Sequence, residues 1–420
     1  MVVKMQNNKY SKIALLALAF SHQAAYASPD HVKADGGIEI YRSEDNNYWF
    51  SMHGVVKLDA VAFPDNYKAR RDEFPSGTNL RAVENSFGGG IGEDLSFSVS
   101  LSFENGVSVS DAYFTYSGID NMEFNIGQVI SPFCLENANS GKWIPFLERS
   151  LPIVAFAPCM GIGGQMVQWS DHHAIILSTT TPLAGTNRDT PNIKHRSDNI
   201  TSTARFVYAP INCHDKVLQF GLSGVYAENS PTFRDGSPNT DGRRFSTRPE
   251  ARARNTPQLI NSGNMMEIDN YNEWGAELSG QYGPLVVQSE YLQANVHRGS
   301  KPTLNFYGWH TQASYVLTGE HREHKMKSGS FGKITPKCKY GAWEVAARYS
   351  MVNLNDEDIH GGKENNVSLA LNWYVNNNLL IRTNYIYASI DPTQALGNAN
   401  NPNPAKRHMN IIGTRAQIVW

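Results

Sequence analysis

Segments in which apolar and polar residues alternate follow one another along most of the chain after residue 48. From Val367 to Trp373 every second residue is apolar, and the residues between them are polar or small. Residues 343–351 and 379–387 are patterned in the same way, and the connections between such segments are rich in Gly, Asn, Asp and Pro. This pattern is typical of β-strands joined by turns.

We therefore expect an all-β fold with about sixteen antiparallel strands. The predicted strands begin near residues 50, 79, 94, 108, 121, 162, 172, 200, 216, 270, 284, 303, 341, 364, 379 and 408. An even number of strands agrees with a closed transmembrane β-barrel of the bacterial outer membrane. Alternation alone also fits a soluble β-sandwich, so the aromatic residues are needed to choose between the two folds.

Aromatic residues lie near the ends of the predicted strands, where a membrane barrel has its interfacial girdles. They include Trp49, Phe50, Tyr271, Trp274, Tyr307, Trp309, Trp343, Trp373, Tyr374, Tyr385 and Tyr387. The last predicted strand alternates from Ile412 to Ile418 and finishes on Trp420. Outer-membrane barrels share such a final strand, and we expect the barrel assembly machinery to bind it.

The N-terminal residues have the pattern of a secretory signal peptide. Three lysines precede an apolar run of eight residues, and the small-residue site Ala25-Tyr26-Ala27 follows it. We expect cleavage after Ala27. The predicted organisation is a signal peptide over residues 1–27, a short periplasmic segment over 28–48 and a barrel over 49–420.

Composition excludes two other classes of protein. A mean hydropathy of -0.42 and the absence of a run of ~20 apolar residues argue against a helical membrane protein. The predicted signal peptide holds three of the 37 basic residues and none of the 39 acidic ones, so its removal leaves 34 against 39, a net charge of about -5. This balance argues against a nucleic-acid partner.

Strand order assigns each connection to one side of the membrane. With both termini in the periplasm, the connections over residues 130–160, 183–199, 229–269 and 391–407 are extracellular. Most periplasmic turns are short, but strand order makes residues 320–340 a long one, so either two further strands lie there or the turn has a role of its own.

Several stretches resemble the phosphate-selective porin family of the porin O and porin P type. They are SPFCLENANSGKWIPFLERSLP at 131–152, FSTRPEARAR at 245–254, FYGWHTQASYVLTGEHRE at 306–323, GAWEVAARYS at 341–350 and GGKENNVSLALNWYVNN at 361–377. The resemblance implies a homotrimer of 16-stranded barrels. It also implies that a third loop (130–160), a fifth loop (229–269) and a long periplasmic turn (320–340) fold into the channel and narrow it.

An anion channel needs donors and positive charge along its path, because an anion loses hydration there. Arginine suits phosphate since its planar fork donates two hydrogen bonds. The candidate pore-lining and anion-binding residues are Lys142, Arg149, Arg205, Arg243, Arg244, Arg248, Arg252, Arg254, Arg322, Lys325, Lys327, Arg348, Arg382 and Arg415. The fifth loop and the long turn are strongly basic, whereas Glu136 and Glu148 offset the two cations of the third loop. The role of Lys142 follows from the resemblance, since the family has a basic residue in this loop.

Other candidate sites are weaker. The run Gly88-Gly89-Gly90 lacks the Lys-Ser/Thr of a phosphate-binding loop. His321, Glu323 and His324 lack the spacing of a catalytic zinc helix, as do His172 and His173, so we expect no metal and no cofactor. Four cysteines in an exported chain permit disulfides, and Cys134 with Cys159 could close the base of the third loop.

The sequence thus predicts an outer-membrane porin that lets small anions, phosphate or polyphosphate among them, diffuse passively. Its other partners would be membrane lipid and lipopolysaccharide. A general diffusion porin for mixed ions and small solutes is one alternative, and a sealed barrel that acts as a surface adhesin is another. We do not expect an enzyme, because no nucleophile or paired carboxylate stands out for catalysis.

Overall fold

The computed structural model describes residues 37–64, 74, 76–104, 106–158, 160–182, 200–228, 232–234, 237–239, 243–253, 256–265, 267–392 and 407–420. The predicted signal peptide and most of the predicted extracellular segments 183–199 and 391–407 lie outside these residues. No helix among the described residues is long and apolar enough to cross a membrane.

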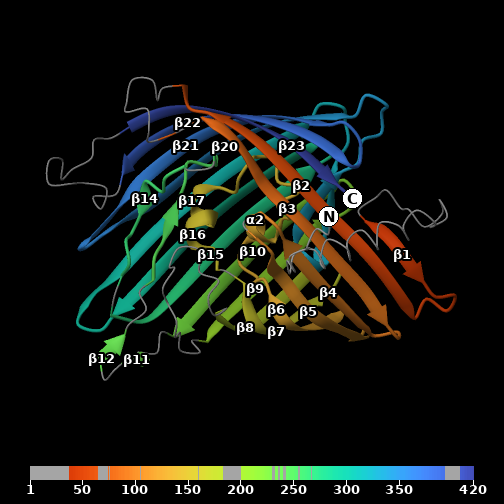
Figure 1. The fold of residues 1–420 in the computed structure, drawn as a ribbon, viewed down its shortest axis with the longest axis horizontal. Coiled ribbons are helices and arrows are strands. Elements are labelled where there is room, and N and C mark those ends of the chain that lie inside the picture. Colours follow the sequence, from red (N-terminus) through yellow and green to blue (C-terminus); the bar gives the residue numbers. More distant parts are fainter. Residues whose placement is uncertain are drawn as a thin grey trace, which may run out of the picture.

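Sixteen antiparallel strands close into a barrel (Figure 1). They are β2 (Tyr48–Ala62), β3 (Gly77–Ile91), β4 (Leu95–Ser102), β5 (Ser108–Ile119), β6 (Met122–Val129), β7 (Gly161–Trp169), β8 (His173–Pro182), β9 (Thr201–Asn212), β10 (Lys216–Glu228), β15 (Ile268–Tyr282), β16 (Leu285–Arg298), β17 (Lys301–Val316), β20 (Ala342–Asp356), β21 (Ile359–Tyr374), β22 (Leu379–Pro392) and β23 (Arg407–Val419). The barrel closes where β23 pairs with β2. Every strand begins within two residues of its predicted start, except β21, which begins five residues earlier than predicted.

A short additional strand, β1 (Ile38–Arg42), forms a hairpin with β2. It occupies the part of β2 that β23 does not reach, because the chain's final residue pairs with Gly54. Figure 1 shows β1 beyond the C-terminus, along the line of β2. Part of the predicted periplasmic segment 28–48 therefore extends the sheet.

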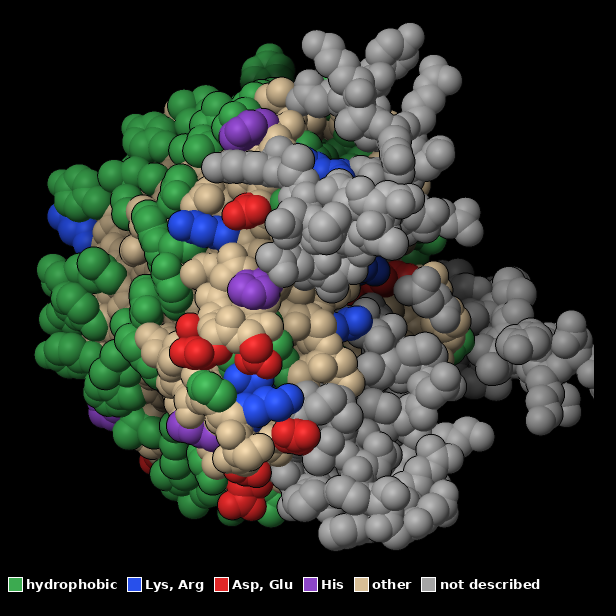
Figure 2. Space-filling view, turned by 90° about the vertical axis from the view of Figure 1, so that its left-hand side faces the viewer, with side chains coloured by type: hydrophobic (Ala, Val, Ile, Leu, Met, Phe, Trp, Pro, Cys, Tyr) green, Lys and Arg blue, Asp and Glu red, His purple; other side chains and the backbone are tan. Residues whose placement is uncertain are grey.

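The alternation predicted from the sequence separates two faces of the barrel wall. Val367, Leu369 and Leu371 on β21 are between 45% and 51% exposed, whereas Asn366 and Ser368 of the same strand are fully buried. Apolar side chains gather along one margin of the space-filling view, with polar and charged side chains beside them (Figure 2). The apolar face points outward toward lipid, and the polar face points inward.

The inward face is covered by three segments of the chain. The third loop carries α2 (Leu135–Ala138) and α3 (Leu151–Phe156), and the long turn carries β18 (Arg322–Lys325), η4 (Met326–Ser328) and β19 (Ser330–Ile334). The fifth loop carries β11 (Thr232–Arg234), β12 (Ser237–Asn239), β13 (Ser246–Thr247) and β14 (Ile260–Asn261). A hydrophobic cluster joins Leu151 of α3, Phe245 of the fifth loop and Phe306 of β17. The expectation of inward-folded loops is confirmed.

Candidate functional site

Arg348 on β20 holds the third and fifth loops to the barrel wall. Its guanidinium lies 3.1 Å from a carboxylate oxygen of Glu136 and 2.8 Å from one of Glu250. It also donates to the carbonyl of Glu148 and lies over the Phe146 ring, 4.1 Å from the centroid. Because a buried charge is costly without a partner, these groups fix two loops in one position.

The Glu148 carboxylate of the third loop is bound by two arginines of the wall. Arg81 on β3 donates to it at 2.6 and 2.9 Å, and Arg415 on β23 donates to it at 3.3 Å. Burial opposes ionisation of Glu148, but the charges of Arg81 and Arg415 outweigh it and hold its pKa well below the usual range. The third loop is therefore anchored by a carboxylate that stays charged at neutral pH.

Wall side chains also satisfy main-chain oxygens of the third loop. The donors and their acceptor carbonyls are Arg382 to Phe146 (3.2 Å), Arg415 to Leu147 (2.7 Å), Lys57 to Gly141 (2.9 Å) and Gln417 to Lys142 (3.0 Å). An irregular loop can be buried only if its carbonyls find such donors. The polar face of the strands supplies them, and this explains why the loop folds inward.

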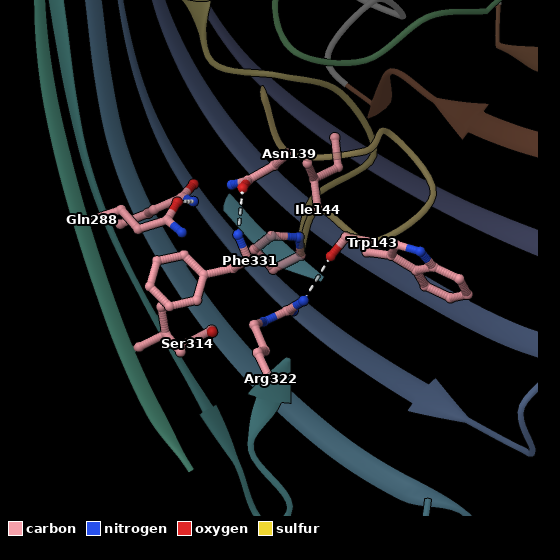
Figure 3. Close-up of a pocket in the computed structure, with 10 residues that line it drawn as sticks. Asn139, Trp143, Ile144, Gln288, Ser314, Arg322 and Phe331 are labelled. Atoms are coloured by element: carbon pink, nitrogen blue, oxygen red, sulfur yellow. Dashed lines mark hydrogen bonds between the residues drawn. The ribbon is translucent and has the colours of Figure 1, made fainter. Parts of the chain in front are cut away.

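The long turn meets the third loop inside the barrel. Arg322 of β18 lies 2.6 Å from the Glu344 carboxylate and donates to the carbonyl of Trp143 at 2.7 Å. The backbone N–H of Phe331 donates to Asn139 Oδ1 at 2.8 Å. Figure 3 shows both hydrogen bonds between the loop and the turn, beside a small cavity.

A second arginine holds the tip of the long turn. Arg205 on β9 forms a bidentate pair with Glu277 on β15, with both distances 2.7 Å. It also donates to the carbonyls of Ser328 (2.6 Å) and Gly329 (3.0 Å). Gly329 has a left-handed backbone with φ +50°, and a Cβ there would lie 2.8 Å from Val207.

Glu250 anchors the fifth loop by a buried carboxylate. It accepts hydrogen bonds from Ser350 (2.6 Å) and Ser368 (2.8 Å) of the wall, in addition to its ion pair with Arg348. The one acid within the basic stretch 243–254 is thus held by groups of the wall and shares the charge of Arg348 with Glu136.

The structure divides the predicted anion-binding residues into three groups. Arg205, Arg322, Arg348, Arg382 and Arg415 are buried. Lys142, Arg149, Arg243, Arg244, Arg248 and Arg252 are half-buried, and Lys325 and Lys327 are exposed. Arg254 lies outside the described residues. These five arginines point into the barrel. Their guanidinium groups bind carboxylate and carbonyl oxygens of the protein, because the third loop, the fifth loop and the long turn cover the wall.

Several of the less buried cations also have protein contacts. Arg149 donates to the carbonyls of Glu136, Asn137 and Asn139, at α2 and just beyond its C-terminal end. Arg243 lies over the Tyr271 ring and 3.4 Å from Glu273, and Arg248 donates to the carbonyl of Thr256. Lys325 pairs with Glu323 at 3.5 Å, and Lys327 pairs with Glu123 at 2.5 Å.

Lys142 of the third loop differs from these residues. Its carbonyl is held by Gln417, while its half-buried ammonium has no hydrogen-bond or ion-pair partner in the part of the chain that the structure describes. Burial lowers the pKa of Lys142, and the carboxylates of Glu84 and Asp111 oppose that shift.

Sequence reasoning missed Arg81 and Lys57. A register shift in the pairing of β2 with β3 places Lys57 opposite Ala82 and Leu58 opposite Leu80, so Arg81 is an extra residue in β3. Such a bulge interrupts the alternation by which inward residues are recognised. Lys57 does lie on the face of Asp59, so alternation along β2 could have indicated its inward direction.

Cys134, one half of the possible Cys134–Cys159 disulfide, is a buried free thiol in the structure. Cys159 lies outside the described residues. The Cys134 side chain is instead packed in the cluster of Leu151 and Phe245, and its backbone N–H donates to Ser223 at 3.3 Å. Burial raises the pKa of the Cys134 thiol well above its ordinary value, which disfavours the thiolate needed for exchange.

The chain is similar in sequence and fold to known porins. It is 24% identical to Porin O of Pseudomonas aeruginosa over 90% of this chain and 92% of that protein. Its fold is similar to that of the anion-selective porin from Comamonas acidovorans (TM-score 0.54, 10% identity, 89% of this chain and 100% of the other). It is equally similar to the outer membrane channel DcaP of Acinetobacter baumannii (TM-score 0.54, 10% identity, 90% and 99%). The model of the family described as phosphate-selective porin O and P matches residues 50–420, and the chain belongs to this family.

Proposed function

We propose that this chain is an outer-membrane channel for passive diffusion of small anions, with phosphate-type oxyanions as preferred solutes. The relative named Porin O and the family description support the oxyanion class. The observation that carries the proposal within this chain is the distribution of charge in the third loop.

By sequence, the third loop is nearly neutral, because Glu136 and Glu148 offset Lys142 and Arg149. In the structure, wall arginines pair with both acids: Arg348 pairs with Glu136, and Arg81 and Arg415 pair with Glu148. The loop therefore presents Lys142 to the barrel interior with its own carboxylates already engaged. A partly desolvated ammonium attracts an anion more strongly than one in bulk water.

The fifth loop adds to this field. Residues 243–254 hold five arginines and one acid, and the wall cation Arg348 already pairs with that acid. Arg243, Arg244, Arg248 and Arg252 are half-buried, so part of each residue is exposed to solvent. Guanidinium groups can bind an oxyanion with two parallel hydrogen bonds, which favours phosphate over chloride.

A charge-removal experiment tests the proposal. Lys142→Ala should shift the reversal potential in a KCl gradient toward zero and weaken the block by added phosphate. Lys301→Ala is the matched control, because Lys301 is exposed at the start of β17, where its ammonium lies 3.8 Å from a carboxylate oxygen of Glu267. Equal effects of the two substitutions, or none, would contradict the role of Lys142.

Assembly and export complete the proposal. We infer that the chain is made with a signal peptide that is cleaved after Ala27, and that three barrels associate through their apolar outer faces within lipid and lipopolysaccharide. We infer further that the assembly machinery binds β23 through its end at Trp420. N-terminal sequencing of the membrane form and its mass in mild detergent test the first two points.

A further inference from the structure

A fully buried group of potential metal ligands lies where the third loop meets the wall. It consists of Glu136 on α2, Glu290 on β16 and His310 on β17, and Glu290 and His310 are direct cross-strand partners. His310 Nε2 lies 3.5 Å from a Glu290 carboxylate oxygen and 3.8 Å from one of Glu136. The three residues are at most 2% exposed, and they are separated by up to 174 positions in the sequence.

The hydrogen bonds around His310 determine which ring nitrogen carries the proton. The hydroxyl of Ser150 donates to Glu136 at 2.6 Å, so its single proton is already used. His310 Nδ1 lies 3.1 Å from the same hydroxyl oxygen and must therefore donate to it. In a neutral imidazole this leaves a lone pair on Nε2, and Nε2 has no hydrogen-bond partner among the described residues.

That lone pair lies 3.5 Å from a Glu290 oxygen and 3.8 Å from a Glu136 oxygen, an arrangement that is repulsive when both acids are ionised and neither a proton nor a cation lies between them. The second ring nitrogen of a metal-binding histidine is commonly held in this way by a neighbouring oxygen, which orients the ring. His310 has the features of a metal-binding histidine: Nδ1 carries the proton and donates to Ser150, and Nε2 has a lone pair without a hydrogen-bond partner among the described residues.

The charges of this region do not balance. Its buried carboxylates are those of Glu136, Glu250, Glu277 and Glu290. Among the residues that the structure describes, two guanidinium groups pair with them: Arg348 with Glu136 and Glu250, and Arg205 with Glu277. The described hydrogen bonds to the Glu290 carboxylate come from the backbone N–H groups of Leu135 and Glu136, both at 2.8 Å. If these four acids are ionised and His310 is neutral, their negative charge exceeds the positive charge of the two arginines, which favours a bound cation.

We propose that Glu136, Glu290 and His310 bind a divalent transition-metal ion of the Zn²⁺ class, which fastens the third loop to the wall. Imidazole nitrogen and carboxylate oxygen are both zinc ligands, and a zinc site with three protein ligands keeps a fourth position for water. Tetrahedral bonds of ~2.0–2.2 Å separate neighbouring ligand atoms by ~3.3–3.6 Å, close to the two distances from Nε2. The nitrogen ligand disfavours Ca²⁺ and Mg²⁺, which prefer oxygen alone.

The first experiment measures bound metal. The wild-type chain is refolded in detergent with Zn²⁺ and desalted to remove unbound metal. Its zinc content is then measured by inductively coupled plasma mass spectrometry. We expect about one zinc per chain. His310→Gln and Glu290→Gln should each lower the amount of zinc bound per chain severalfold. His297→Gln is the matched control, because His297 is another wall histidine on β16 and should leave the metal content unchanged.

A second experiment needs no variant to fold. X-ray absorption at the zinc edge of the wild-type protein should show nitrogen and oxygen ligands only. Sulfur ligands would assign the zinc to the cysteines instead and overturn the proposal. Metal-free wild-type protein after refolding with Zn²⁺, or full retention by His310→Gln, would overturn it as well.

Discussion

Arg415 on the last barrel strand and Asp59 on the first form a bidentate ion pair directly across the seam that closes the barrel. Both N–O distances are 2.7 Å, and the two residues are cross-strand partners in the pairing of β23 with β2. Arg415 also donates to the Leu147 carbonyl of the third loop. One buried side chain thus links closure of the barrel to the position of the loop inside it.

Asp59→Asn should destabilise the barrel strongly, because the buried Arg415 loses one of its two carboxylate partners and keeps only Glu148. Loss of one partner from a buried pair costs about 3–5 kcal/mol. The measurement is the free energy of unfolding in denaturant. Glu39→Gln breaks the more exposed Arg42–Glu39 pair outside the barrel and should have little effect. Similar results for the two variants would contradict a structural role of the seam pair.

Arg348→Gln should loosen both loops that narrow the channel, because Glu136 and Glu250 lose a shared cation. We expect larger and noisier single-channel currents. Arg298→Gln is a suitable control, since Arg298 is also buried but pairs with the more exposed Asp358 away from the inward loops. Unchanged conductance in Arg348→Gln would show that the loops do not depend on this residue.

Gly54→Ala should impair folding of the barrel. A Cβ at Gly54 would lie 2.1 Å from the Trp420 ring, in the pairing that holds the chain's final residue to β2. Gly164→Ala on β7 meets no atom within 4 Å and serves as the control. The yield of heat-modifiable folded barrel on a gel measures the effect. Equal yields would mean that the Trp420 ring can move aside at little cost.

Acid should weaken the packing of the long turn through His324. Its ring nitrogens lie within 3.0 Å of Asn212 and Gln219, and burial, with the charge of Arg205, lowers its pKa to about 4. Since the ordinary value is 6.5, the unfolded chain binds the proton more tightly. The stabilisation is complete above about pH 6.5 and is lost as the pH falls toward 4.

The unfolding temperature measured at pH 7 and pH 5 tests this pH dependence. His324→Gln should show a smaller decrease than the wild type over this range. His408→Gln, which removes an exposed histidine on β23, should behave like the wild type. A wild-type protein whose unfolding temperature is the same at both pH values would contradict the prediction.

The barrel could be predicted from the sequence because its signal is local. Side-chain direction in a strand repeats every two residues, and the apolar face must meet lipid. Val367, Leu369 and Leu371 therefore indicate both the strand and its outward face. The early start of β21 was missed because its first residues, beginning Ile359-His360-Gly361, lack that alternation. The inward folding of the loops was indicated by the family resemblance and not by the residue pattern.

The partners of the inward charges could not be predicted, because they depend on contacts between distant segments. Arg348 meets Glu136 across 212 positions, and Arg415 meets Asp59 across 356. The alternation of apolar and polar residues along the sequence does not indicate which distant residues form such pairs. Sequence reasoning identified the correct inward face for these arginines but could not show that the third loop and its neighbours would cover it. Lys142 and Glu136 are both charged residues of the third loop, and the structure shows that Glu136 pairs with Arg348 whereas Lys142 has no ion-pair partner among the described residues.

Single-channel recording of the refolded protein in a planar bilayer with a tenfold KCl gradient, followed by added phosphate, tests the central claim most directly. The proposed function predicts a reversal potential of the sign for chloride permeation and a current that phosphate blocks at low concentration. A reversal potential near zero without phosphate block would make this chain a general diffusion porin, and the absence of any conductance would contradict a channel altogether.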